Sequence, residues 1–355
     1  MNAPHPLAAV AVRAANLDDP GECARIDGFV AAHPDATLFH RPQWSRAVER
    51  GCRQRAHYLL AERGGALVGC LPLTEIRSAL FGNALVSAGF ATGGGILAEG
   101  EAAAAALAEA AWALAARQDC AGVELRGGPI PAGWHASTGT YSAFSRPLPA
   151  QTEALLASLP RRQRAEVRRA NEYGLEVTIG RDAAHLAAHY RVYAESVRNL
   201  GTPVFPKSLF DAMIEGFGDD AEILLVAKDG RPLATMLTFY FRGLSQPVWG
   251  GGTFEARVRS ANDLAYFAVM QRGIARGCDR ADFGRSKLGT GPYQRKRIWG
   301  FEERTLTYGI RTVDGAAPRA VNPLDAKYRL KVAAWQKLPL WLANRLGPPI
   351  ARGLG

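Results

Sequence analysis

The amino-acid sequence predicts an α/β protein that contains two domains, each built around a mixed sheet. Its 355 residues exceed the length of one average compact domain. Hydrophobic residues make up 48% of the chain and charged residues 21%, so there is enough apolar material for two cores. The order hairpin, strand, long helix, short strand occurs twice. Because the two halves share no residue-level identity, we interpret the repeat as architectural.

The first half contains one complete copy of this order. Two short apolar runs separated by Gly64-Gly65 predict a hairpin, and the Ala-rich run that begins at Glu101 predicts a long helix. Glycines 93–95 come before that helix. The expected elements are a helix at 43–49, hairpin strands at 57–62 and 66–74, strand-like residues at 80–91, a helix at 101–118 and a short buried strand at 122–125.

The second half repeats the order, with a hairpin about Asp229-Gly230. The expected helices are 161–172, 182–198, 207–217 and 260–276, and the expected strands are 175–179, 222–227, 233–242, 247–252 and 280–283. Ser, Pro and Gly become frequent between Tyr141 and Gln151, which places the seam there. The predicted domains are residues 1–145 and 146–315, followed by a basic amphipathic tail at 316–355.

Charge and cysteine content narrow the function classes. The chain has 43 Lys and Arg against 33 Asp and Glu, a formal net charge of +10, which favours an anionic partner. Its five cysteines form no CxxC pair, so neither a disulfide framework nor a zinc site is predicted, and a reducing cytoplasm fits. No apolar run is long enough to span a bilayer, and no basic region precedes the first apolar run as in a signal peptide. Only His185 and His189 have metal-ligand spacing on a helix; we interpret them as a partly exposed helix face and predict no metal site.

The densest basic segment is PRRQRAEVRRA, which begins at Pro160. On a helix Arg161, Arg164 and Arg168 share one face, while Arg162 and Arg169 share another. Arginine forks bind phosphates in a bidentate manner, which favours a nucleotide or RNA phosphate. The alternative is a solvated helix face whose charges pair with carboxylates elsewhere, and charge alone does not separate the two.

A second cluster extends from Ala281 to Phe301, with the sequence ADFGRSKLGTGPYQRKRIWGF. It predicts a short strand, a glycine-rich loop and a helical turn with three successive cations, so backbone amides and cations together would attract negative charge. The spacing GxxxxGK(S/T) of a nucleotide-binding P-loop is absent. The alternative is that these glycines serve only the turn.

Four segments together resemble a known family. They are PRRQRAEVRRA, LGTPVFPKSLF, VWGGGTFEARVRSANDLAYFAVMQRGIARGCDRADFGRSK and GPYQRKRIWGF. They resemble the Fem-type (FemAB) branch of the GNAT acyltransferase superfamily, and most of all the FemAB-like proteins associated with exosortase and PEP-CTERM exopolysaccharide systems. FHRPQW, ALVGCLPL and the turn at Gly93–Gly95 support it in the first half.

The resemblance implies two tandem GNAT-like domains and transfer of an acyl or aminoacyl group to an amine, in cell-envelope or exopolysaccharide biosynthesis. The donor that it implies is acyl-CoA or aminoacyl-tRNA. It implies no further cofactor. GNAT acetyltransferases hold the pyrophosphate of acetyl-CoA with the loop Q/R-x-x-G-x-G/A, and residues 257–262, RVRSAN, lack those glycines.

The resemblance also suggests roles in the second cluster. It implies that Lys296 stabilises the developing oxyanion, and Arg297, the next residue, is a candidate for substrate binding. Arg285 would bind phosphate or carboxylate, and Tyr293 would orient substrate. Asp282, at the end of its strand, is a candidate proton acceptor, although a strand-end Asp also serves turns and caps. Arg161, Arg164 and Arg168 are the further candidates for substrate binding.

Two other functions compete with an acyltransferase. A non-catalytic module with the GNAT fold would use the basic site to bind an anionic glycan or nucleotide. Nonspecific nucleic-acid binding fits less well, because acidic residues are interspersed throughout, so no DNA partner is predicted. The expected partner is an anionic small-molecule or carrier-linked substrate, with tRNA as another candidate.

The C-terminal tail offers a second expected contact. Residues 326–355 combine Lys and Arg with Trp and Leu and contain no acidic residue. This pattern is typical of a segment that lies on an anionic membrane surface, here the inner face of the membrane; the alternative is a C-terminal helix packed on the body.

Overall fold

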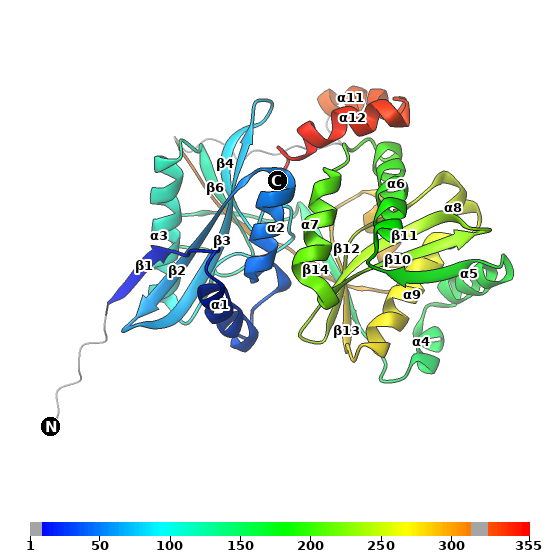
Figure 1. Cartoon of the computed structure of the whole chain (residues 1–355), viewed down its shortest axis with the longest axis horizontal. Coiled ribbons are helices and arrows are strands. Elements are labelled where there is room, and N and C mark those ends of the chain that lie inside the picture. Colours follow the sequence, from blue (N-terminus) through cyan, green and yellow to red (C-terminus); the bar gives the residue numbers. More distant parts are fainter. Residues whose placement is uncertain (1–8, 314–325) are drawn as a thin grey trace. The chain divides into compact units, whose positions relative to one another are not determined.

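The computed structural model describes residues 9–313 and 326–355 (Figure 1). These residues form two compact units, which we name unit 1 (9–137, 307–313 and 353–355) and unit 2 (138–306 and 326–352). Each unit has one mixed sheet with helices on both faces. No helix in the described ranges is long and apolar enough to cross a membrane.

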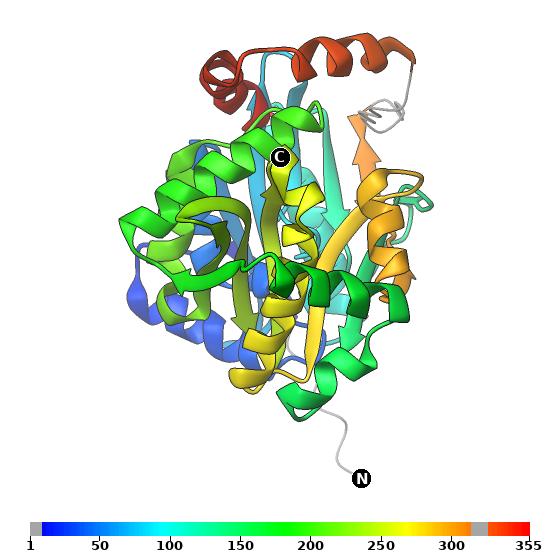
Figure 2. The same ribbon diagram turned by 90° about the vertical axis from the view of Figure 1, so that its right-hand side faces the viewer.

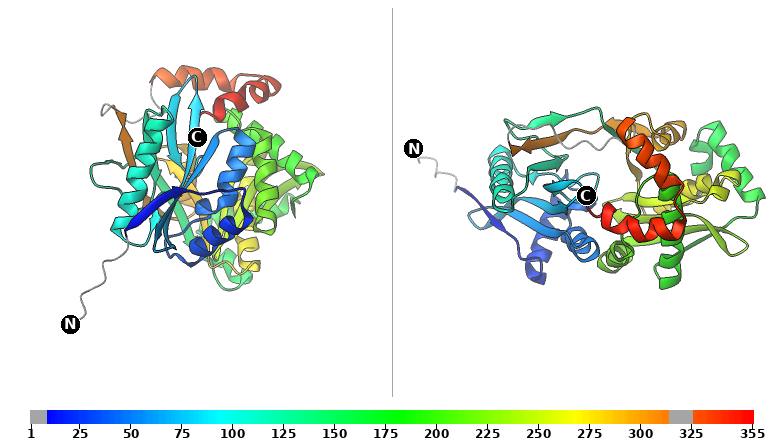
Figure 3. Two further views of the ribbon diagram at one scale, coloured as in Figure 1. Left: turned by 60° about the vertical axis from the view of Figure 1, so that its left-hand side comes forward. Right: turned by 90° about the horizontal axis from the view of Figure 1, so that it is seen from above.

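Unit 1 is built around an eight-stranded sheet in the order β1-β2-β3-β4-β6-β15-β7, with β5 paired to β3. Its strands are β1 (Val10–Ala14), β2 (Arg55–Arg63), β3 (Ala66–Ser78), β4 (Gly82–Ser87), β5 (Leu97–Ala98), β6 (Gly122–Arg126), β7 (His135–Ser137) and β15 (Tyr308–Thr312). Its helices are α1 (Pro20–Ala32), the 3₁₀ turn η1 (Leu38–His40), α2 (Pro42–Cys52) and α3 (Glu101–Arg117). Helix α3 covers one face of the sheet, and α1 and α2 lie on the other (Figure 3).

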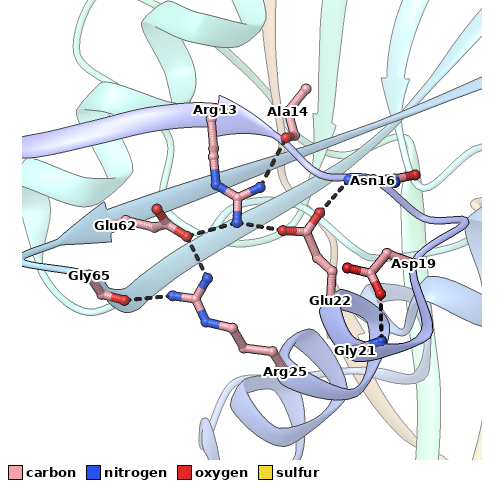
Figure 4. A network of polar contacts seen from close by, with 9 residues as sticks. All are labelled: Arg13, Ala14, Asn16, Asp19, Gly21, Glu22, Arg25, Glu62 and Gly65. Carbon is pink, nitrogen blue, oxygen red and sulfur yellow. Dashed lines mark hydrogen bonds and ion pairs between the residues drawn. The ribbon is translucent and has the colours of Figure 1, made fainter.

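Polar contacts hold the first strand and helix of unit 1 together (Figure 4). Arg13 on β1 pairs with Glu22 of α1 and, at 3.0 Å, with Glu62 of β2. Arg25 of α1 contacts the same Glu62 carboxylate and donates to the carbonyl of Gly65 at 2.8 Å. The chain of ion pairs Glu22–Arg13–Glu62–Arg25 therefore joins β1, α1 and β2.

Unit 2 is built around a seven-stranded sheet in the order β14-β8-β13-β12-β11-β10-β9. Its strands are β8 (Tyr141–Pro147), β9 (Glu176–Gly180), β10 (Ala221–Lys228), β11 (Arg231–Phe241), β12 (Leu244–Gly252), β13 (Arg280–Lys287) and β14 (Glu302–Thr305). Its helices are α4 (Thr152–Ser158), α5 (Arg161–Glu172), α6 (Ala183–Asn199), α7 (Lys207–Phe217), η2 (Gly218–Asp220), α8 (Phe254–Val258), α9 (Ala261–Ala275), α10 (Gly291–Ile298), α11 (Ala326–Gln336) and α12 (Leu340–Ala351).

Helix α9 packs on the unit 2 sheet, and α4 and α5 pack on α9 (Figure 2). The core at this face includes Val167 of α5, Val269 and Met270 of α9 and Trp299. Helices α6 and α7 pack against the sheet through an aromatic group in which Phe210, Phe239 and Trp249 meet edge to face. Both faces of the sheet are therefore buried, as its apolar strands require.

The structure moves the predicted boundary between domains. It divides the chain after Ser137 rather than near residue 145, because β8 pairs with β13 and β14 in unit 2. Strand β15 lies within the predicted second domain but pairs with β6 and β7 in unit 1. The described part of the predicted tail divides as well, since residues 326–352 belong to unit 2 and Gly353–Gly355 to unit 1. Residues 316–325 lie outside the described ranges.

Candidate functional site

Two parallel strands separate in the middle of the unit 2 sheet. β12 and β13 pair at only two positions, Leu244 with Arg280 and Ser245 with Ala281. Beyond them the strands no longer pair, so the backbone groups that β13 turns toward β12 need other partners. We name this place the β12–β13 opening. The first residues beyond the last pair are Gln246 and Asp282.

Asp282 is held at the opening by two donors. Its Oδ1 accepts a hydrogen bond from the backbone N–H of Gly284 at 2.7 Å, and its Oδ2 accepts from Gln246 Nε2 at 3.3 Å. Burial raises the pKa of the Asp282 carboxyl. A half-buried carboxyl with a raised pKa is a candidate proton acceptor. Gln246, itself buried, was not predicted from sequence. The local sequence gives no signal for it, because its position beside Asp282 depends on the pairing of β12 with β13.

Lys296 lies beneath a bulge that follows Asp282. The register between β13 and β8 shifts between Asp282 and Arg285. The Lys296 ammonium donates to the carbonyls of Phe283, Gly284 and Arg285, the last two at 3.2 Å. Its side chain is 7% exposed, and burial lowers its pKa to about 8, while the Asp282 carboxylate acts in the opposite direction. The three N–H groups of the ammonium thus each have a carbonyl partner, and in this conformation Lys296 stabilises the bulge. Its role toward an oxyanion stays a prediction.

Tyr293 and Arg297 meet at a different carboxylate. The Tyr293 hydroxyl donates to Glu303 at 3.0 Å and 3.1 Å, and this bond raises the pKa of the phenol. Ser142 also donates to Glu303, at 2.7 Å, and Arg297 approaches it at 3.9 Å. Glu303 on β14 therefore holds the side chains of Tyr293 and Arg297 on α10, and this role was not predicted from the sequence. The predicted roles of Tyr293 and Arg297 toward substrate stay predictions.

The predicted arginines fall into two places. Arg285 lies on β13 with its guanidinium 4.6 Å from the ring centre of Tyr141, close in sequence to Asp282. Arg161 and Arg168 are exposed on α5. Arg164 donates to the carbonyls of Ala157 and Leu159, both at 3.1 Å, and so caps α4. No contact found among the described residues joins the α5 arginines to Asp282 or Lys296.

Carboxylates occupy the start of α9, where a GNAT acetyltransferase would hold a pyrophosphate. Ser260 precedes the helix and donates to Glu166 of α5 at 2.7 Å. Asp263, in the first turn, accepts from Arg295 at 2.8 Å and from the Trp299 indole at 3.2 Å. Each carboxylate is also paired with an arginine, Glu166 with Arg169 at 3.4 Å and Asp263 with Arg295. The chain's own ion pairs therefore occupy this helix end, and residues 257–262 lack the glycines with which a GNAT loop binds a pyrophosphate.

Unit 1 has the corresponding opening, between β4 and β6, and its own loop fills it. These strands pair in parallel only at Leu85 with Val123 and Val86 with Glu124. In the loop that follows, the carbonyl of Gly89 accepts from the Trp44 indole at 3.0 Å, and that of Ala91 accepts from Arg126 at 3.0 Å. Because these groups are already paired, unit 2 is the better candidate for a reaction site.

Of the two histidines with metal-ligand spacing, only His185 lies on a partly exposed helix face as predicted. His185 is half-buried and contacts Asp182 at 2.7 Å, but His189 is fully buried and contacts the Thr235 hydroxyl at 2.8 Å. Within the described part of the chain, no group of three or more His, Cys, Asp or Glu side chains is arranged to hold a metal ion. A hollow of about 410 Å³ between α6 and the β10–β11 turn is lined by none of the predicted site residues.

Comparison with known proteins agrees with this architecture. Residues 157–297 match the family described as an acetyltransferase (GNAT) domain, a segment that includes β12, β13 and most of α10. The structure is similar to that of FemX, with 15% identity and a TM-score of 0.65, covering 84% of this chain and 96% of that one. No curated protein matches the sequence.

Two further solved structures are similar. One is a tandem GNAT protein from the clavulanic acid biosynthesis pathway, with 11% identity and a TM-score of 0.55, covering 87% of this chain and 100% of that one. The other is the C-terminal domain of a putative lysylphosphatidylglycerol synthetase from Agrobacterium fabrum, with 12% identity and a TM-score of 0.55, covering 82% and 92%. The predicted fold class, tandem GNAT-like domains of mixed α/β structure, is confirmed.

Proposed function

We propose that unit 2 transfers an activated acyl or aminoacyl group to an amine at the β12–β13 opening. The observation that carries the proposal is the half-buried Asp282 carboxyl, held by Gln246 and the Gly284 amide one residue beyond the last parallel pair. The GNAT domain match over residues 157–297 supports acyl transfer.

In this reaction the amine nitrogen attacks the acyl carbonyl carbon, and the new C–N bond forms as the bond to the leaving group breaks. The Asp282 carboxylate accepts the proton that the amine loses, and the leaving group departs with a proton from solvent. Burial favours the protonated form of Asp282, so the carboxylate is a stronger base than an exposed Asp. Gln246 orients it, and Lys296 fixes the bulge that carries Asp282.

The donor we propose is aminoacyl-tRNA rather than acyl-CoA. Ion pairs of the chain's own side chains occupy the start of α9, which lacks the glycine loop of a GNAT acetyltransferase, whereas the exposed Arg161 and Arg168 of α5 suit a polyanionic donor. We further propose that the reaction belongs to cell-envelope or exopolysaccharide biosynthesis, in association with an exosortase system; the support for this is the resemblance found in the sequence. In this proposal the protein works in the cytoplasm, at the inner face of the membrane.

The test is turnover with a panel of charged tRNAs and acyl-CoA species and simple amine acceptors, followed by mass spectrometry of the acceptor. We expect Asp282→Asn to abolish turnover while the protein stays folded, because Asn keeps the shape and an acceptor for the Gly284 amide. Asp229→Asn, at an exposed turn, is the matched control. Full turnover by Asp282→Asn contradicts the proposed base. Ligand binding without turnover for any donor favours the non-catalytic module.

A further inference from the structure

Helices α11 and α12 lie on unit 2 beside α6 (Figure 1). Gln336, at the end of α11, donates to the carbonyl of Asn199 at 3.1 Å, and Arg198 donates to the carbonyl of Gln336 at 3.1 Å. In α12 the buried residues are Ala343, Gly347 and Ala351. Their spacing of four places them along one side of the helix, which is the packed side.

The opposite sides of both helices carry large apolar residues in solvent. Trp341 is 69% exposed and precedes Ala343 by two residues, so it lies about 160° around the helix from Ala343. Leu330 of α11 is 80% exposed and stands in the same relation to Val332, which packs against Gly201. Leu346 is 42% exposed. An isolated exposed leucine needs no explanation, but a leucine and a tryptophan on the unpacked sides of adjoining helices are unusual.

The charge of the same segment has one sign. Residues 326–355 contain no Asp or Glu, and Arg329, Lys331, Lys337 and Arg345 are exposed. Arg345 follows Trp341 by four residues and so shares its side of α12. Cations beside exposed Trp and Leu match a bilayer interface, where anionic headgroups bind the cations and the boundary of the acyl chains receives the apolar groups. A nucleic-acid backbone would use the cations but would leave the leucines in water.

We propose that α11 and α12 form a peripheral docking surface for a bilayer that contains anionic lipid. We define this surface as Arg329, Leu330, Lys331, Lys337, Trp341, Arg345 and Leu346. Both helices are too short to span a bilayer and would lie in its interface. This proposal does not depend on the reaction at Asp282, and its test involves no turnover.

The first experiment measures co-sedimentation of the full chain with vesicles of phosphatidylcholine alone and of phosphatidylcholine mixed with phosphatidylglycerol. We expect binding only to the anionic vesicles, and weaker binding as NaCl rises. Leu330→Ser/Trp341→Ser should weaken it by on the order of tenfold or more, because both substitutions lose apolar area that the bilayer would remove from water. Phe254→Ser/Val258→Ser is the matched control, because these α8 side chains are 71% and 65% exposed outside the docking surface.

The second experiment separates local charge from net charge. Lys337→Glu/Arg345→Glu and the control Arg55→Glu/Arg117→Glu change the net charge equally, and all four side chains are exposed. We expect only the first pair to lose at least tenfold in vesicle affinity, since it replaces two cations of the docking surface by anions that the anionic lipid repels. Unchanged thermal unfolding of all variants shows that folding is intact.

Three results would overturn the docking surface. The first is equal binding to neutral and anionic vesicles, and the second is wild-type affinity in both α11–α12 variants. The third is a surface that binds tRNA but not vesicles, with tRNA binding lost in Lys337→Glu/Arg345→Glu, which would identify a nucleic-acid contact instead.

Discussion

Gln246 and Asp282 face each other from two parallel strands, one residue beyond the last backbone pair, with Gln246 Nε2 donating to Asp282 Oδ2 at 3.3 Å. A donor on a carboxylate stabilises its charged form, whereas burial stabilises the protonated form. Burial is the larger effect here, and the pKa of Asp282 is raised. The pair therefore sets the pH at which the proposed base becomes available.

The first prediction concerns this pH. Because the pKa of Asp282 is raised, the acid limb of the rate–pH profile should lie above the ordinary range of an aspartate. Gln246→Ala removes a donor to the carboxylate and should move the acid limb to still higher pH. Measuring kcat/KM against pH checks both statements. A limb that stays in place in Gln246→Ala would show that Gln246 does not act through Asp282.

The second prediction is that Lys296 contributes to stability. Lys296→Met leaves three carbonyls at the bulge without their buried donor, so we expect the free energy of unfolding to fall by about 2–4 kcal/mol. Arg297→Ala, whose side chain is 57% exposed, should change it by less than about 0.5 kcal/mol. Urea unfolding of both variants gives the comparison. A stable but inactive Lys296 variant would instead support its predicted oxyanion role.

The third prediction concerns Gly95 in unit 1. A Cβ at this position would lie 1.8 Å from the carbonyl oxygen of Gly127, and both partners are backbone. Gly95→Ala should therefore prevent correct packing of β6 with this loop and cost more than about 3 kcal/mol. Gly93→Ala is the control, because its Cβ would meet the Phe39 ring at an ordinary 3.4 Å. Equal thermal unfolding temperatures for the two variants would contradict the prediction.

The fourth prediction is acid sensitivity from His40. Burial lowers its pKa to about 4, below the ordinary value of about 6.5. The folded state favours the neutral ring. The contribution of His40 to the free energy of unfolding is therefore fully present above pH 6.5 and is lost as the pH falls toward 4. His40→Gln should flatten the dependence of unfolding free energy on pH across this window. The exposed His135→Gln should leave the slope unchanged.

The fifth prediction concerns the ion pairs that join β1, α1 and β2. Glu62 forms ion pairs with both Arg13 and Arg25. The hydrogen bond from Arg13 is the main reason that the pKa of Glu62 is lowered. Its stabilising effect is present above the ordinary carboxyl pKa and is lost as pH falls through the lowered value. Glu62→Gln should cost about 1 kcal/mol at low salt and less at high salt. The exposed Glu99→Gln should show neither the cost nor the salt dependence.

Local sequence was a good guide to the helices. The predicted segments 161–172 and 207–217 coincide with α5 and α7, and 101–118 differs from α3 by one residue. These helices have amphipathic or Ala-rich patterns that are readable within a short window. The predicted parts of the site that lie close in sequence, such as Asp282 and Lys296, also lie close in space.

Long-range pairing was not readable from sequence. The helix Pro20–Ala32 and strand β15 were missed, and Gln246 gave no signal of its own. Its position depends on the parallel pairing of strands more than thirty residues apart in the chain, which no local pattern encodes. The fully buried state of His189 likewise depends on packing against Thr235, which lies on another element.

The exchange of strands between the two halves of the chain has a consequence for synthesis on the ribosome. Unit 1 needs β15, which ends at Thr312, to pair with both β6 and β7. A nascent chain that has completed residues 1–137 therefore still presents unpaired strand edges until residues 138–312 have also been translated. Such edges can pair with other chains, so the emerging protein is exposed to misassembly while about half of its 355 residues are synthesised. A fragment ending at residue 145 would stay in that condition permanently.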